Sequence, residues 1–383
     1  MNRGKPENIA LPEKPPKMYL ADTPISKSED DLLGRARFAQ RLGDTIRDWN
    51  KEESLVIALY GPWGSGKTSI LNLAVEQIEK TTANVPEDER PIVIRFNPWN
   101  FSEQNQILEM FFHEIATELG YRSASKTLKK IGTQLQRYGS FLTPISKIPV
   151  PGFRFLSIVE KIGKGMKEFG NENLAKLKTK ISELFKKMKR RIIIVIDDID
   201  RLNEVEIRQM FQLIKLNADF PNTIYLLAFD REVVEKALET TPKISGRAYL
   251  EKIVQVAFDI PMIEPTRLTR ILFTEMDKLI ADVPEENFDQ VRWGNLYYGG
   301  LRHFFSSVRD IKRFINGFSF SFQLVSSEVN SIDVIGIEAL RILAPKVYHA
   351  IARNKEIFTL TSTFKRSVDN NQLKQQYEVY TKL

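Results

Sequence analysis

The apolar positions along the chain form continuous runs that alternate with stretches of helical spacing. The continuous runs lie at residues 54–60, 91–96, 192–197 and 223–229, and a fifth follows a short helix within 249–261. Residues 32–50, 67–80 and 174–191 instead place apolar side chains three or four positions apart, which predicts helices. Strands that are apolar on both faces and alternate with helices predict a parallel α/β sheet with helices on each side.

From Glu264 onward only helical spacing remains, which predicts a domain boundary near residue 262. Residues 1–20 are polar and rich in proline, and they lack the apolar stretch of a signal peptide. We therefore expect a flexible N-terminal arm at 1–20, an α/β domain at 21–262 and an all-α helical domain at 263–383.

The composition excludes several kinds of chemistry. The 383 residues include no cysteine, which rules out disulfides, thiolate zinc sites and cysteine nucleophiles. The three histidines are far apart, so the metal expected is Mg²⁺ bound by carboxylate and phosphate oxygens. No run reaches the roughly 18 apolar residues of a membrane span, and we expect a cytoplasmic protein.

Positive charge is concentrated in one segment. The whole chain has a formal net charge of +7, yet residues 122–191 hold 18 Lys and Arg against 4 Asp and Glu. This basic insert predicts either a site for nucleic acid or an anionic surface, or a helical hairpin whose lysines face water. The densest cluster of cations is at its end, at Lys186, Lys187, Lys189, Arg190 and Arg191.

A glycine-rich loop follows the first strand and precedes a helix. Its spacing, G-x4-G-K-T, is that of a phosphate-binding P-loop. Glycines let successive backbone N–H groups turn toward a phosphate, Lys67 reaches the β and γ oxygens, and the Thr68 hydroxyl ligates Mg²⁺. The residues expected to bind the nucleotide here are Gly61, Pro62, Trp63, Gly64, Ser65, Gly66, Lys67, Thr68 and Ser69.

Acidic residues follow the third strand. Asp197 ends a run of isoleucines and is expected to complete the magnesium site, because ligands bind at the carboxyl ends of parallel strands. Asp198 is expected to polarise the attacking water. It is shorter than glutamate, so hydrolysis is expected to be slow. We expect Asp200 and Arg201 to pair with each other.

Further residues are candidates for sensing the phosphates. Asp230 follows the fourth strand, and Arg231 after it is either a finger acting across a subunit interface or an ion-paired arginine. Arg309 lies four residues before Arg313 in the helical region. It is a candidate catalytic arginine that senses the γ-phosphate, the alternative being packing.

These motifs, in this order, resemble the KAP family of P-loop NTPases. The matching stretches include "LYGPWGSGKTS", "FNPWNF", "IIIVIDDIDRL", "LLAFDREVV" and "VRDIKRFIN". The resemblance implies the strand order 5-1-4-3-2 and a place near the adenine for Arg35. It also marks Trp99, which is expected to belong to the core or to line the nucleotide or an interface. Many family members carry membrane helices between the phosphate motifs, whereas this chain has the basic insert. Bacterial members are associated with phage exclusion.

Three functions follow as hypotheses. The first is an ATPase that uses Mg²⁺-ATP as a molecular switch in anti-phage defence, acting as a homo-oligomer or with partner proteins. The second is an ATP-dependent oligomeric scaffold with little hydrolysis, and the third is a nucleic-acid-binding module that uses the basic insert. A GTPase is disfavoured because no N-K-x-D motif follows a strand, and a small-molecule kinase because no arginine-rich lid is present.

Overall fold

The structure is a computed structural model that describes residues 19–102, 107–121, 125–146, 174–217, 219–239, 245–284, 288–325, 328–355 and 358. The chain divides into two compact units. The sheet unit consists of the described residues within 24–262, and the helical unit combines residues 19–23 with the described residues from 263 onward. Most of the predicted N-terminal arm, residues 1–18, lies outside the described residues.

The sheet unit is built on five parallel strands in the order β2-β3-β4-β1-β5. The strands are β1 (Leu55–Tyr60), β2 (Ile92–Phe96), β3 (Ile192–Ile196), β4 (Thr223–Phe229) and β5 (Val256–Asp259). Read from the other edge this order is 5-1-4-3-2, so the predicted fold class is confirmed.

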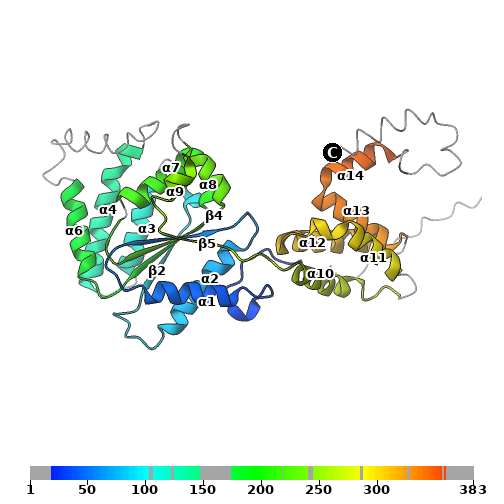
Figure 1. The fold of residues 1–383 in the computed structure, drawn as a ribbon, viewed down its shortest axis with the longest axis horizontal. Coiled ribbons are helices and arrows are strands. Elements are labelled where there is room, and N and C mark those ends of the chain that lie inside the picture. The colour runs from blue at the N-terminus through cyan, green and yellow to red at the C-terminus, as the bar shows by residue number, and fades with distance from the viewer. Residues whose placement is uncertain are drawn as a thin grey trace, which may run out of the picture. The chain divides into compact units, whose positions relative to one another are not determined.

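Helices cover both faces of the sheet (Figure 1). One face packs against α1 (Ala36–Asp48) and α2 (Lys67–Thr81). The opposite side carries α3 (Ile107–Tyr121), α4 (Lys126–Ser146), α6 (Leu174–Lys186), α7 (Glu204–Gln212), α8 (Arg231–Leu238) and α9 (Gly246–Leu250). Alternate residues of β3 enter the two cores, which explains why the strand is apolar at every position.

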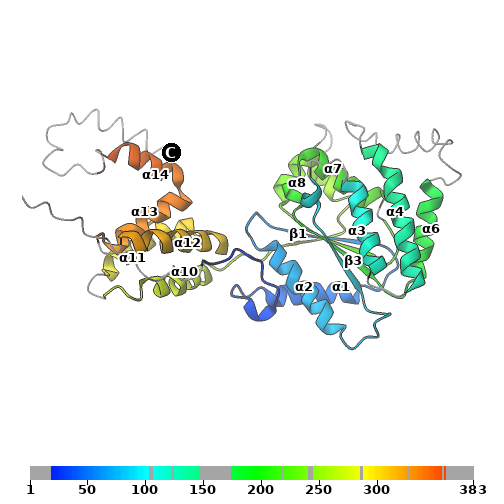
Figure 2. The ribbon, with the colours of Figure 1, turned by 180° about the vertical axis from the view of Figure 1, so that it is seen from behind.

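Seen from behind, α3, α4 and α6 run side by side (Figure 2), and α3 packs against β2. Shorter elements complete the unit: η1 (Ser28–Asp30), η2 (Pro98–Phe101), η4 (Ile199–Arg201) and the π-helical turn η5 (Leu213–Asn217). The predicted helix at 174–191 ends at Lys186, and the residues after it lead into β3.

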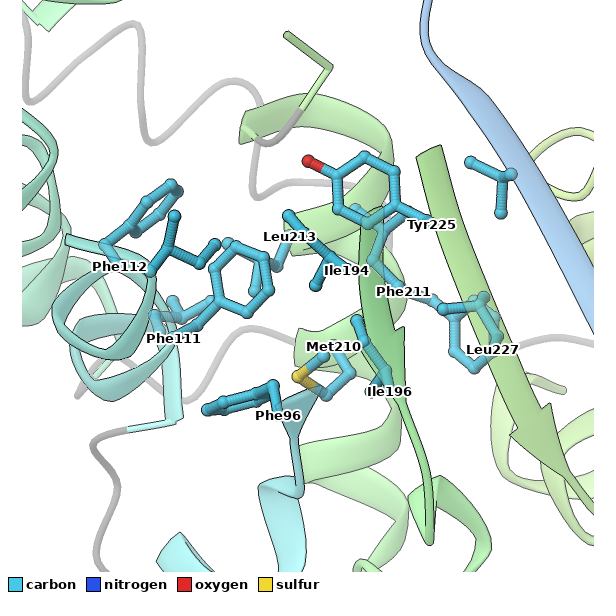
Figure 3. Close-up of a cluster of buried hydrophobic side chains, with 14 of the residues drawn as sticks. Phe96, Phe111, Phe112, Ile194, Ile196, Met210, Phe211, Leu213, Tyr225 and Leu227 are labelled. Atoms are coloured by element: carbon cyan, nitrogen blue, oxygen red, sulfur yellow. The ribbon is translucent and has the colours of Figure 1, made fainter. Parts of the chain in front are cut away.

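Aromatic packing fixes the carboxyl end of β2. Phe96 stacks on Phe101 with ring centroids 5.7 Å apart and meets Phe111 edge-on at 5.2 Å. Figure 3 shows Phe96 and Phe111 beside Met210 of α7 and Ile196 of β3. Because Phe101 belongs to η2, the turn that follows β2 is packed against the last residue of that strand.

The helical unit consists of α10 (Pro265–Ile280), α11 (Gln290–Gly299), η7 (Leu301–Phe304), α12 (Val308–Val325), α13 (Ser331–Leu343) and α14 (Pro345–Arg353). Its core includes Phe314 and Phe318 of α12, both fully buried. The segment before the sheet unit joins this core, because Leu20 N donates to Asn316 Oδ1 at 2.7 Å. Among the described helices of the whole chain, none is long and apolar enough to cross a membrane.

Candidate nucleotide site

The loop between β1 and α2 has the backbone that its glycines predict. Gly64 and Gly66 take φ values of 80° and 91°, which side chains with a Cβ rarely allow. Gly66 is the N-cap of α2, so the N–H groups of the first helical turn face the loop. These N–H groups and the positive end of the helix dipole favour an anion here.

Lys67 is the first residue of α2, directly after this loop, and is only 7% exposed. Its Nζ donates to the backbone oxygens of Gly61 at 2.9 Å and Pro62 at 3.3 Å. Its third contact is with Asp200 Oδ2 at 3.4 Å. The three acceptors match the three N–H bonds of an ammonium group, so the lysine is satisfied by the chain itself.

Thr68 and Asp197 meet at the end of β3. The Thr68 hydroxyl donates to Asp197 Oδ2 at 2.6 Å, and the backbone N–H of Asp198 donates to Asp197 Oδ1 at 2.8 Å. Burial raises the pKa of Asp197, and the hydrogen bond from Thr68 acts in the opposite direction. A hydroxyl beside a carboxylate is an all-oxygen donor pair, which fits Mg²⁺.

Asp198 is held in place from two sides. It takes a left-handed backbone conformation with φ 60°, which is uncommon for a residue with a side chain. Asn97 Nδ2 donates to its Oδ2 at 2.9 Å, and Arg201 Nε pairs with its Oδ1 at 2.7 Å. The Arg201 guanidinium in turn lies 4.7 Å from the centre of the Trp99 ring.

One expectation about this segment is wrong, and one of the alternatives left open for Trp99 is excluded. Asp200 does not pair with Arg201, because the left-handed turn at Asp198 directs Asp200 to Lys67 and returns Arg201 to Asp198. Trp99 is 49% exposed and covers Arg201, so the core alternative is excluded.

Arg35 is buried against the backbone of the loop. Its guanidinium donates to the carbonyl oxygens of Ser65 and of Pro261, and it is 6% exposed. Burial lowers its pKa, although Asp31 nearby raises it. The contacts that the structure gives Arg35 are therefore with the loop and with the segment after β5.

The other predicted residues of this unit occupy varied positions. Trp63 at the tip of the loop is 73% exposed, and Ser69 Oγ accepts a hydrogen bond from Ile25 N at 3.3 Å. Asp230 caps α8 by accepting from Glu232 N at 3.1 Å. Arg231 pairs with Glu235 at 2.7 Å and lies over the Tyr60 ring, so the ion-paired alternative describes it.

Arg309 belongs to the helical unit. Its Nε contacts Asp22 Oδ2 at 2.6 Å, and Lys312 Nζ donates to the backbone oxygen of Ala21 at 2.8 Å. Arg313 donates to the carbonyl of Ile342 at 3.3 Å. The predicted role of Arg309 toward a γ-phosphate stays a prediction.

The end of the basic insert makes contacts within the fold. Lys189 pairs with Glu89 at 3.5 Å, Arg190 Nε donates to Arg90 O at 2.7 Å, and Arg191 donates to Lys51 O at 3.2 Å. Residues 122–124 and 147–173 of the insert lie outside the described residues. The exposed cations of α4 and α6 include Lys126, Lys129, Lys130 and Lys176.

Sequence reasoning missed Asn97 and the partner of Asp200. Asn97 follows β2, the strand that pairs with β3, so its position at the same sheet edge as Asp198 was a usable signal. The partner of Asp200 depends on the backbone turn at Asp198, which no residue pattern reveals.

A profile of the KAP family P-loop domain matches residues 35–325, and this range contains Lys67, Thr68, Asp197 and Asp198 with the side-chain contacts described for them. The chain belongs to the KAP family. A relative of this KAP chain, the phage T7 exclusion protein of Escherichia coli (strain K12), is 25% identical over 354 residues. The match covers 85% of the KAP chain and 46% of the relative, so the chain spans about half of that relative's length.

Solved structures show a distant likeness to the KAP chain. The Aeropyrum pernix ORC2 protein, in ADPNP–ADP complexes, shares 13% identity at a TM-score of 0.39, covering 81% of this chain and 68% of that one. The Aeropyrum pernix ORC1 protein, in complex with DNA, shares 12% identity at a TM-score of 0.42, with 87% and 70% covered. Likeness at this level says nothing about ligands or partners.

Proposed function

We propose that this chain binds Mg²⁺-ATP, hydrolyses it slowly, and uses the cycle as a switch in anti-phage defence. The observation that carries the proposal is the 2.6 Å hydrogen bond from the Thr68 hydroxyl to Asp197 Oδ2. It joins the P-loop to the end of the central strand β3, beside the buried Lys67. Membership of the KAP P-loop family supports nucleotide binding at this place.

Each residue then has a chemical role. The N–H groups of the loop and the ammonium of Lys67 bind the phosphates, while Thr68 and Asp197 hold Mg²⁺. The metal, when bound, neutralises part of the phosphate charge. Asp198 orients and polarises the attacking water, while Asn97 and Arg201 each already engage one of its two carboxylate oxygens. This double restraint supports slow turnover.

Finer assignments belong to the same proposal. Arg35 holds the loop from behind, Asp230 senses the γ-phosphate from the end of β4, and Arg309 senses it from the helical unit. Action as a homo-oligomer or with partner proteins of the same defence system, in the cytoplasm, completes the proposal. The anti-phage role is supported by the name of the E. coli relative.

Two alternatives remain as candidate functions. An oligomeric scaffold with little hydrolysis is favoured by the ion pair that restrains Asp198. A nucleic-acid contact is favoured by the exposed lysines of α4 and α6, whereas Lys189, Arg190 and Arg191 are used within the fold. Salt-sensitive duplex binding that is lost on neutralising Lys126, Lys129, Lys130 and Lys176 would identify this contact.

Phosphate release from the purified chain tests the proposal. Wild type with Mg²⁺-ATP is compared with Lys67→Ala and with Asp198→Asn, with and without duplex DNA. Turnover that both substitutions abolish, with nucleotide binding kept by Asp198→Asn, is the expected result. Nucleotide binding without release in any condition would support the scaffold, and no binding at all would refute the proposal.

A further inference from the structure

Asp200 is the one acidic side chain that contacts Lys67 in the part of the chain that the structure describes. The two side chains are 8% and 7% exposed, and their charged atoms are 3.4 Å apart. Asp200 Oδ1 is buried and has no hydrogen-bond partner among the described residues. Burying a carboxylate with an unsatisfied oxygen lowers the free energy of unfolding, so the position of Asp200 beside the loop suggests a role other than stability.

We infer that Asp200 is the counter-ion of Lys67 in the nucleotide-free chain and that the nucleotide phosphates replace it. This inference rests on the proposed binding of nucleotide at the loop. All three N–H bonds of Lys67 already have acceptors within the chain. Lys67 therefore reaches a phosphate oxygen only by giving up an existing acceptor, and Asp200 is the charged one.

The exchange gives Asp200 control over affinity. Without nucleotide, its charge compensates the buried ammonium. With nucleotide, Lys67 faces phosphates instead, and the carboxylate is left close to other anions, which is unfavourable. Asp200 thus stabilises the empty loop and opposes the occupied one, so it is a positioning residue that weakens binding.

The first test concerns the nucleotide-free protein alone. Melting temperatures are measured for wild type, Asp200→Asn, Lys67→Met and the double variant. Each single variant leaves one buried charge unpaired and is expected to melt about 5 °C or more below wild type. The double variant should recover most of this loss. Additive losses in the double variant would overturn the pairing.

The second test measures the affinity for ADP of wild type and of each variant without Mg²⁺. The affinity of wild type is also measured with Mg²⁺, to establish that the protein binds nucleotide. Asp200→Asn is expected to bind ADP about tenfold more tightly than wild type, because the competing charge is gone. Asp88→Asn, at an exposed loop position, is the matched control and should bind as wild type does. Equal or weaker binding by Asp200→Asn would overturn the exchange.

The two tests separate this inference from the function on which it rests. Wild type that binds no ADP with or without Mg²⁺ would refute the proposed function and the exchange with it. The melting cycle would still decide whether Lys67 and Asp200 stabilise each other. Binding by wild type with no gain in Asp200→Asn would leave the function standing and refute the exchange alone.

Discussion

The two ends of β3 carry opposite charges and use them in different ways. Before the strand, Lys189 pairs with one surface carboxylate, and Arg190 and Arg191 donate to backbone carbonyls of neighbouring segments. After it, Asp197 accepts from Thr68 and Asp200 contacts Lys67, both near the P-loop. The same strand thus contacts neighbouring loops at its amino end and brings polar side chains together beside the P-loop at its carboxyl end.

The difference teaches that charge density alone does not identify a site. The cationic end has more charges in a row, yet its partners are dispersed and partly solvated. The acidic end brings side chains from two distant motifs within hydrogen-bond distance. The two ends differ in whether their charged side chains are buried and lie close together. Substitutions at the carboxyl end should change turnover or nucleotide affinity, whereas those at the amino end should change only stability.

The largest effect is expected at Lys67. Lys67→Ala removes the cation that the proposed function assigns to the phosphates, and turnover should fall about 100-fold or more with nucleotide binding lost. Lys80→Ala is the matched control, because this exposed lysine lies on the same helix and pairs with Glu76 at 2.8 Å. Phosphate release and ADP affinity are the measurements. A Lys67→Ala variant that binds like wild type would remove the distinction between the ends.

Asp198→Asn is expected to lower turnover about 100-fold while ADP affinity changes little. The amide keeps the shape of the side chain but does not polarise water as a carboxylate does. Single-turnover phosphate release, compared with equilibrium ADP binding, checks the separation. A parallel loss of affinity would show that Asp198 supports the loop rather than the chemistry.

Arg201→Gln should act in the opposite direction and raise turnover a few-fold. The substitution breaks the 2.7 Å ion pair that restrains Asp198, and because Arg201 is partly exposed, it should cost less than about 1 kcal/mol in stability. Arg208→Gln is the control, since Arg208 has the same 32% exposure and pairs with Glu204 on α7. Lower turnover in Arg201→Gln would assign Arg201 a supporting role in the reaction.

The smallest effect is expected at the amino end of β3. Arg190→Gln loses the hydrogen bond to Arg90 O and should cost about 1 kcal/mol in the free energy of unfolding, with turnover unchanged. Lys187→Gln, at an exposed position, should change neither. Denaturant unfolding and phosphate release measure both variants. A change in turnover by Arg190→Gln would link this end to the reaction.

The sequence predicted which residues lie at the carboxyl end of β3, but it did not predict which of them pair with each other. The sheet order came from the family resemblance, while the loop and Asp197 were recognisable because local patterns specify a strand, a glycine turn and a strand end. The partners of Asp200 and Arg201 were assigned wrongly because one left-handed residue, Asp198, redirects the two side chains that follow. The acceptors of Arg190 and Arg191 are backbone carbonyls, which every residue has, so the sequence does not indicate which residue accepts.

The placement of two of the four tryptophans makes the site a source of optical signals. Trp63 projects from the tip of the P-loop with 73% of its surface exposed, and Trp99 lies against the guanidinium that restrains Asp198. Indole emission follows the polarity of its surroundings, so a nucleotide entering the loop would change the emission of Trp63. Breaking the ion pair between Arg201 and Asp198 would change the emission of Trp99. Variants with Trp63 or Trp99 replaced by phenylalanine would therefore show which emission change comes from which residue. Nucleotide binding and the separation of Asp198 from Arg201 could then be followed in time without any added dye.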